Sequence, residues 1–342
     1  MNGISDQYRT ITDGAGWLDR RNRGRVRVDG RDGVKFLQAL LSNDVARLKE
    51  NEGIFATYLT PQGRMIADLT IYHRGSWLLA DVAPGLAARL TARLDQVIFA
   101  EQVTVTDASA AIVELSVVGG RAAAVVAQAL SLDEARLGAL AENEQLTAPD
   151  ARMWVARAGD ARLPMFSIFA DADGAADASG TQTAAAFDVI VSRLEDAGAR
   201  PLSGDLADAL RVDAGRPAFG IDMTEETIPL EAGLLDRAIS TTKGCYVGQE
   251  VVIRILHRGG GRVARRLVTM AIDPATASGI AAGAVLSREG RDIGRMTTVA
   301  SSLTTDGVVA LGYVQRELAE VGQRLALRDR PDVTAVVTGF AG

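Results

Sequence analysis

Residues 210–260 concentrate the side chains of this chain that could do chemistry. Arginines, acids, glycines and the only cysteine, Cys245, alternate there with short apolar runs. Such a density of polar groups beside apolar residues is typical of the lining of a ligand pocket. We therefore expect a binding or catalytic site to draw on this segment.

The surroundings of Cys245 favour a reactive thiol. Lys243 precedes it by two residues, Gly244 and Gly248 flank it, and a helix is predicted to start at residues 248–250. A nearby cation and the N-terminal dipole of a helix both favour the thiolate, and glycines leave the backbone open to a ligand. The alternative is a small apolar residue in the core, the usual role of a lone cysteine. We predict that Cys245 is a working thiolate.

The residue counts exclude several kinds of site. One cysteine allows no disulfide within the chain and no cysteine-based zinc site, and the two histidines, His73 and His257, are far apart in sequence. One thiol also cannot hold an iron–sulfur cluster alone. No phosphate loop, dinucleotide fingerprint or nucleophile elbow is present. We expect no intrinsic metal or cluster.

Composition and charge indicate an ordinary globular protein. The 342 residues are 47% hydrophobic and 23% charged, with a net charge of −6 and both signs mixed along the chain. The mixed charge argues against a direct nucleic-acid partner. No apolar run reaches the ~18 residues of a membrane span, and no signal peptide is recognised at the N-terminus. We expect a cytoplasmic monomer that does not enter the membrane.

Hydrophobic periodicity predicts mixed helices and strands. Residues 32–48 have helical spacing, and the stretch after Gly53 alternates, with turn sequences at 60–63 and 73–76, as three antiparallel strands do. A helix is predicted within residues 83–99 and a short strand at 103–107. Because helices and strands mix without regular βαβ alternation, the predicted fold class is α+β.

Three units are expected along the chain, over residues 1–110, 111–262 and 263–342. The second should hold a strand ending at Val118, helices over 122–141, a strand over 162–169, a loop over 171–180, and helices over 183–197 and 204–214. Beyond residue 262, short alternating stretches separated by Gly, Asp and Ser turns predict a small antiparallel β-barrel.

Five segments of the sequence carry a family resemblance. KGCYVGQE at residues 243–250, the preceding RVDAGRPAFGIDM and IPLEAGL, and the N-terminal FLQALLSNDV with TPQGRMIADL resemble the YgfZ-type folate-binding proteins. These are relatives of the aminomethyltransferase (T-protein) of the glycine cleavage system, the GcvT superfamily. The resemblance implies two α+β units and a β-barrel in a cloverleaf, with tetrahydrofolate or a one-carbon derivative in the central hole.

The resemblance also implies which residues bind folate. Glu231 matches the pterin-binding glutamate, because a carboxylate can accept two adjacent N–H donors of the ring. Arg254 and Arg258 are placed to hold the two carboxylates of the glutamate tail, and Lys243 is also expected among the folate-binding residues. For Arg258 a solvated helix face is an equal alternative.

Two aspartates of the first unit complete the expected site. Asp68 matches one of the family's paired aspartates beside the reacting folate nitrogen, where it would be catalytic. Its neighbour is Ala67, so one carboxylate of the pair is absent, which puts aminomethyl transfer in doubt. Asp81 takes the place of a residue that contacts the pterin. Both could instead be ordinary acids at strand ends.

Three functions remain open at this point. The first is a tetrahydrofolate-binding protein that supports iron–sulfur cluster assembly or repair, and thereby tRNA modification, with assembly or client proteins as partners. The second is a folate-dependent aminomethyltransferase or related one-carbon transferase. The third is a folate-dependent demethylase or oxidase, whose usual flavin domain this chain lacks. Whether the protein is an enzyme depends on which of these holds.

Overall fold

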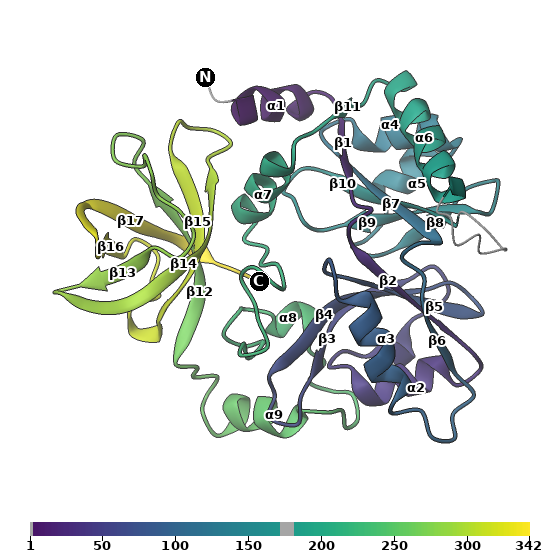
Figure 1. Ribbon diagram of the computed structural model, residues 1–342, viewed down its shortest axis with the longest axis horizontal. Helices are drawn as coiled ribbons and strands as arrows, with labels where there is room; N and C mark the ends of the chain where they lie inside the picture. Colours follow the sequence, from purple (N-terminus) through teal and green to yellow (C-terminus); the bar gives the residue numbers. More distant parts are fainter. Residues whose placement is uncertain (1–2, 172–180) are drawn as a thin grey trace.

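The computed structural model describes residues 3–171 and 181–342 and contains two sheets and a barrel (Figure 1). The first sheet has the order β3-β4-β5-β2-β6. Its strands are β2 (Gly24–Asp29), β3 (Gly53–Leu59), β4 (Met65–His73), β5 (Trp77–Val82) and β6 (Thr104–Asp107). The three predicted antiparallel strands are therefore confirmed as β3, β4 and β5.

The helix predicted over residues 32–48 is wrong in its second half. The α-helix α2 (Gly33–Leu40) ends early, and a separate turn of 3₁₀-helix, η1 (Val45–Arg47), follows. Leu41 is extended and forms a β-bridge with Tyr58, so the edge of the sheet competes with the helix there. Together with α3 (Ala87–Asp95), these helices pack on the first sheet around Leu37, Leu69 and Leu90.

The second sheet has the order β11-β1-β7-β10-β9-β8. Its strands are β1 (Gly16–Asp19), β7 (Ile112–Val118), β8 (Gln145–Thr147), β9 (Met153–Ala158), β10 (Met165–Asp171) and β11 (Arg200–Pro201). Three helices cover one face: α4 (Ala122–Leu130), α5 (Glu134–Gly138) and α6 (Thr181–Asp196). The helices predicted over 122–141 are thus confirmed as α4 and α5, and residues 172–180 of the predicted loop lie outside the described residues.

The N-terminal end of the chain belongs to the second sheet. Strand β1 pairs with β7, and α1 (Gly3–Thr12) packs beside α7 (Gly204–Asp213) through Ile11 and Leu206. The first strand and helix were not predicted from the sequence. The chain therefore forms strand β1 of the second sheet, then all strands of the first sheet, and then the remaining strands of the second sheet.

The C-terminal region is a closed antiparallel barrel, as predicted. Its order is β12-β15-β14-β13-β16-β17. The strands are β12 (Arg265–Ile272), β13 (Val285–Arg288), β14 (Arg291–Ser301), β15 (Val308–Gln315), β16 (Arg324–Leu327) and β17 (Arg330–Phe340). Alternate residues such as Val268, Met270 and Ile272 fill its interior, which is the pattern of a small barrel. The α+β fold with a C-terminal barrel is thereby confirmed.

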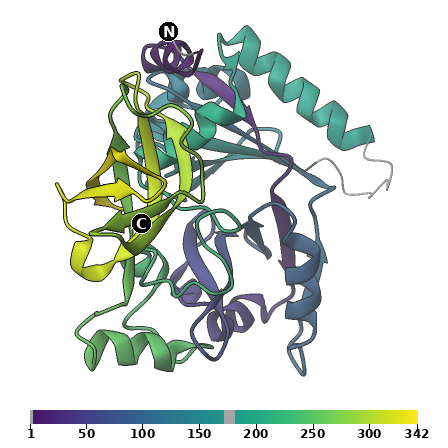
Figure 2. The same cartoon turned by 60° about the vertical axis from the view of Figure 1, so that its left-hand side comes forward.

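A long connection between α7 and the barrel ties the three parts together. It contains the short helices α8 (Leu235–Ala238) and α9 (Gln249–His257) and runs past the β3–β4 hairpin (Figure 2). One apolar cluster joins Leu59 of β3, Met223 of the connection and Leu311 of β15. Within the described part of the chain, no helix is long and apolar enough to span a membrane.

Candidate functional site

A cavity of about 750 Å³ lies where the two sheets meet α7 and the connection. Strand pleating explains its lining, because alternate residues of a strand point to the same face. Asp68, Thr70 and Tyr72 of β4 line the cavity, while Ile71 between them packs in the core of the sheet. The second sheet contributes Leu18, Glu114, Ser116 and Ser167, and the third wall contains Asp205, Asp208, Arg211 and residues 216–221.

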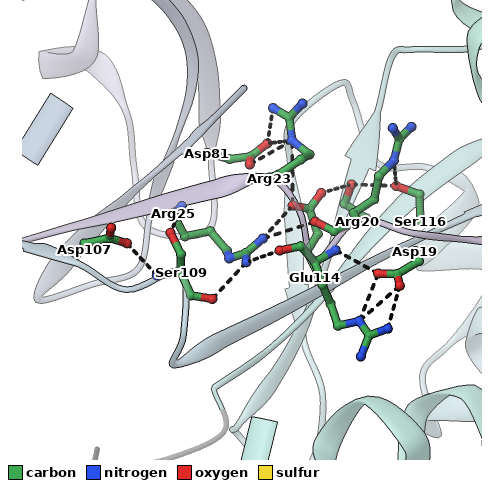
Figure 3. A network of polar contacts seen from close by, with 11 residues as sticks. Asp19, Arg20, Arg23, Arg25, Asp81, Asp107, Ser109, Glu114 and Ser116 are labelled. Carbon is green, nitrogen blue, oxygen red and sulfur yellow. Dashed lines mark hydrogen bonds and ion pairs between the residues drawn. The ribbon is translucent and has the colours of Figure 1, made fainter. Parts of the chain in front are cut away.

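An ion pair forms part of the wall that the first sheet contributes. The Nε of Arg23 donates to both carboxylate oxygens of Asp81, at 3.0 and 2.9 Å, and its Nη2 lies 2.8 Å from Oδ2 (Figure 3). Asp81 is almost fully buried, whereas the Arg23 side chain remains 27% exposed. The paired charges offset the cost of burying either alone and leave the guanidinium facing the cavity.

Asp68 has no such partner. No ion pair joins it to a basic side chain within the described residues, and it lies partly buried in the cavity wall. Burial raises the pKa of Asp68 from 3.8 to about 6, Arg23 opposes the shift, and Asp81 adds to it. A carboxyl with that pKa can both take up and release a proton near neutrality.

Glu114 is a second perturbed carboxyl, on the wall from the second sheet. It is 2% exposed, and its Oε1 accepts a hydrogen bond from Ser167 Oγ at 3.3 Å. Burial raises the pKa of Glu114 from 4.5 to about 8; Asp81 adds to the shift, and the arginines Arg23 and Arg25 oppose it. The cavity therefore holds two carboxyls, on different sheets, whose charge changes between mildly acidic and mildly alkaline pH.

The third wall is held by arginines. Arg211 donates through Nη1 to Asp222 at 2.6 Å and through Nε to Asp208 at 2.7 Å. Arg216 donates to the carbonyl oxygen of Gly159 at 2.9 Å. These contacts hold residues 216–221 against the cavity, beside the exposed side chain of Ile221.

The structure brings two of the predicted site residues into the cavity, Asp68 and Asp81. Glu231 does not line this cavity, and its role as the pterin-binding residue stays a prediction. Its Oε2 accepts from Arg265 Nε at 2.9 Å, and its backbone carbonyl accepts from Leu267 N. The IPLEAGL segment thus fastens the connection to the first strand of the barrel.

Lys243 also has a structural role. Its ammonium group donates to the carbonyl oxygens of Gln38 and Leu41, both at 2.6 Å, and of Asn43 at 3.1 Å. These carbonyls lie at the C-terminal end of α2, where a cation is favoured by the helix dipole. Partial burial lowers the pKa of Lys243 from 10.5 to about 8. Lys243 does not line the cavity, and its assignment as a folate ligand stays a prediction.

The remaining predicted residues lie on the outside of the molecule. Arg254 and Arg258 are exposed on and just after α9, and neither lines the cavity. That Arg254 and Arg258 hold the carboxylates of a folate tail stays a prediction. Cys245 is exposed, four residues before α9 begins at Gln249. An exposed thiol does not fill the core, but it is also not part of the central cavity.

Sequence reasoning missed Arg23, Glu114 and Tyr72 as cavity residues. A signal for Glu114 was present in the chain: a charged residue stands inside the apolar run IVELSVV, with Ser116 two positions later on the same face. A buried strand with polar residues at alternate positions indicates a polar cavity on that face. Among the described residues, no group of three or more His, Cys, Asp or Glu side chains could hold a metal ion.

Two α+β sheet units with a charged cavity between them, together with a closed C-terminal barrel, define the architecture of a GcvT-like protein. The chain belongs to this family: residues 1–243 match the GCVT N-terminal domain, and residues 265–339 match the glycine cleavage T-protein C-terminal barrel domain.

Relatives match along almost the whole chain. An aminomethyltransferase of Nostoc sp. (strain PCC 7120 / SAG 25.82 / UTEX 2576) is 26% identical, over 96% of this chain and 85% of that protein. The aminomethyltransferase of Bacillus subtilis (strain 168) is 24% identical, over 94% and 85%. The crystal structure of the glycine cleavage system aminomethyltransferase T from Bartonella henselae superimposes with a TM-score of 0.82 at 23% identity, covering 98% of this chain and 88% of that chain. The last comparison shows the same fold.

Proposed function

We propose that the central cavity binds tetrahydrofolate or a one-carbon derivative of it, and that the protein is a folate-dependent one-carbon transferase of the aminomethyltransferase type. Membership of the GcvT family and the similarity to proteins named aminomethyltransferase support this over the iron–sulfur reading. The cavity volume of about 750 Å³ is within the range of small-molecule sites.

The position of Asp68 in the cavity wall is the observation that carries the proposal. It lies in the cavity wall without a basic partner, and burial places its pKa at about 6. A carboxylate there stabilises positive charge that develops on a folate nitrogen during transfer, and it can accept the proton that the reaction releases. Arg23, beside it, keeps the ionised form available at neutral pH.

The proposal is tested by binding and by turnover. Calorimetry with tetrahydrofolate should give a saturable isotherm, and an aminomethyl-lipoyl donor should yield methylene-tetrahydrofolate in an assay with the purified chain. Asp68→Asn should lower turnover by ~100-fold or more while tetrahydrofolate still binds. Binding without turnover in the wild type would contradict transfer, and no binding would contradict the folate site.

One observation favours the second candidate, a folate-binding protein that supports iron–sulfur clusters. Cys245 is exposed within KGCYVGQE, away from the cavity, where a partner protein can reach it. A single thiol supplies at most one cluster ligand, so any such role is shared with a partner.

The test for this second function is Cys245→Ser. The variant should keep its melting temperature and its tetrahydrofolate affinity but fail to restore iron–sulfur enzyme activity in a strain that lacks the protein. Iodoacetamide should label native Cys245 without denaturant, because the side chain is exposed. Full restoration by the serine variant would contradict the function.

A further inference from the structure

Arg23 connects acidic groups from two different sheets at the cavity. On one side its guanidinium binds Asp81 of β5 through contacts of 2.8–3.0 Å. On the other side its Nε lies 3.8 Å from Oε2 of Glu114, on β7 (Figure 3). The Asp81 contacts are hydrogen bonds and the Glu114 contact is not. Arg23 therefore binds Asp81 of the first sheet more closely than Glu114 of the second sheet.

The carboxyl group of Glu114 is incompletely satisfied. Ser167 donates to Oε1, but Oε2 is buried and has no hydrogen-bond partner. Arg25 Nη1 lies 3.7 Å from Oε2, but its N–H groups are directed to three backbone carbonyls. Burying a carboxylate without close donors costs much more free energy than burying a neutral carboxyl in the same place.

The charges around Glu114 come from several elements. The groups that face it are Arg20, Arg23, Arg25, Asp81 and Tyr72, with the Ser167 hydroxyl. The arginines favour the ionised form, while burial and Asp81 oppose it more strongly and raise the pKa of Glu114 to about 8. At neutral pH the carboxyl is therefore largely protonated, and it loses its proton to solvent in mildly alkaline solution.

We propose that Glu114 is a positioning residue of the candidate site and acts through Arg23. While neutral, Glu114 leaves the Arg23 guanidinium to Asp81, on the same sheet as Asp68. When ionised, it competes for Arg23 from the second sheet and adds a negative charge to the cavity. Arg23 is the group that most favours the ionised form of Asp68. Whether Arg23 lies closer to Asp81 or to Glu114 therefore changes the electrostatic potential at Asp68.

The first test reads Arg23 directly and needs no ligand. In protein labelled with ¹⁵N-arginine, the Nε–H signal of Arg23, assigned with Arg23→Lys, should move with a midpoint near pH 8. In Glu114→Gln, which cannot ionise, the signal should stay constant over that range. An Arg23 signal that does not move, or that moves equally in Glu114→Gln, would overturn the proposal.

The second test rests on the proposed function and measures tetrahydrofolate affinity between neutral and alkaline pH. Because the ligand carries two carboxylates, an added negative charge in the cavity should weaken wild-type binding by about five-fold or more above pH 8. The affinity of Glu114→Gln should not fall. The control, Glu134→Gln, makes the same chemical change on the exposed helix α5 and should follow the wild type.

The two possible failures can be told apart. If the wild type does not bind tetrahydrofolate, the proposed function is contradicted, while the Arg23 signal still decides the role of Glu114. If it binds but Glu114→Gln keeps the alkaline loss of affinity, the role of Glu114 is contradicted and the folate site stands.

Discussion

Asp68, the carboxyl proposed to take part in the reaction, weakens the fold when it is ionised. Its pKa is raised from 3.8 to about 6 in the folded chain, so the folded state binds the proton more tightly than the unfolded state. The stabilisation is complete below the unfolded pKa and is lost as the pH rises through about 6. Ionised Asp68 at neutral pH is therefore a source of strain at the cavity, as is common for functional groups.

Replacing Asp68 should separate stability from activity. Asp68→Asn should unfold with about 1–3 kcal/mol more free energy than the wild type above pH 6, and with a similar free energy below about pH 4. Turnover should fall at the same time. Denaturant unfolding at several pH values measures the first effect, with Asp95→Asn on the exposed end of α3 as control. A constant difference at all pH values would show that Asp68 does not titrate as described.

At the scale of elements, two segments far apart in sequence pack together around one glycine. Gly248, the residue before α9, has φ +83°, and a Cβ built there would lie 2.5 Å from the carbonyl oxygen of Thr60 in the β3–β4 turn. Gly63 of the same turn approaches Val251 of α9. Gly248 is therefore required by its close approach to the Thr60 backbone, and Gly63 by its positive φ and its approach to the Val251 side chain.

Gly248→Ala should disturb this contact. The left-handed backbone and the clash with Thr60 together should cost about 1–3 kcal/mol of unfolding free energy. Gly244→Ala is the matched control, because φ there is not positive and nothing lies within 4 Å of its added Cβ. Thermal unfolding and the rate of Cys245 alkylation would measure the effect. Equal stability of the two variants would contradict the close approach.

At the scale of the whole molecule, Asp222 joins the barrel to the rest of the chain. Its buried carboxylate accepts hydrogen bonds from Arg211 at 2.6 Å and from Thr297 and Thr298 of β14 at 2.5 and 2.6 Å. The backbone N–H of Ala218 donates to it as well, at 3.0 Å. One side chain thus links α7, the cavity loop and the barrel.

Asp222→Asn should loosen that junction. It removes the charge that pairs with the largely buried guanidinium of Arg211, and its amide cannot accept from all of the donors that Asp222 serves, at a cost of about 3–5 kcal/mol. Asp292→Asn, which breaks an exposed pair with Arg328 in the same barrel, should cost less than about 1 kcal/mol. Limited proteolysis and denaturant unfolding test both. A barrel that stays equally protected in Asp222→Asn would contradict the role of this residue.

The sequence by itself determined the local elements and the fold class. The alternation of apolar and polar residues after Gly53 predicted β3, β4 and β5. The short alternating stretches separated by turns after residue 262 predicted the barrel. Both depend on which neighbouring residues can be buried, and that is encoded over a few positions. Where a distant contact intervened, as at Leu41, the prediction was wrong.

Only the tertiary structure decided which polar side chains share the cavity. Asp68 and Asp81 could be proposed from the sequence, but Arg23 and Glu114 meet only because β2 and β7 come together from different sheets. Lys243 and Glu231 stand in suggestive motifs, yet one binds carbonyls at the end of α2 and the other binds Arg265 of the barrel. Which groups a long side chain contacts depends on the packing of units far apart in the sequence, and a local sequence pattern does not predict that packing.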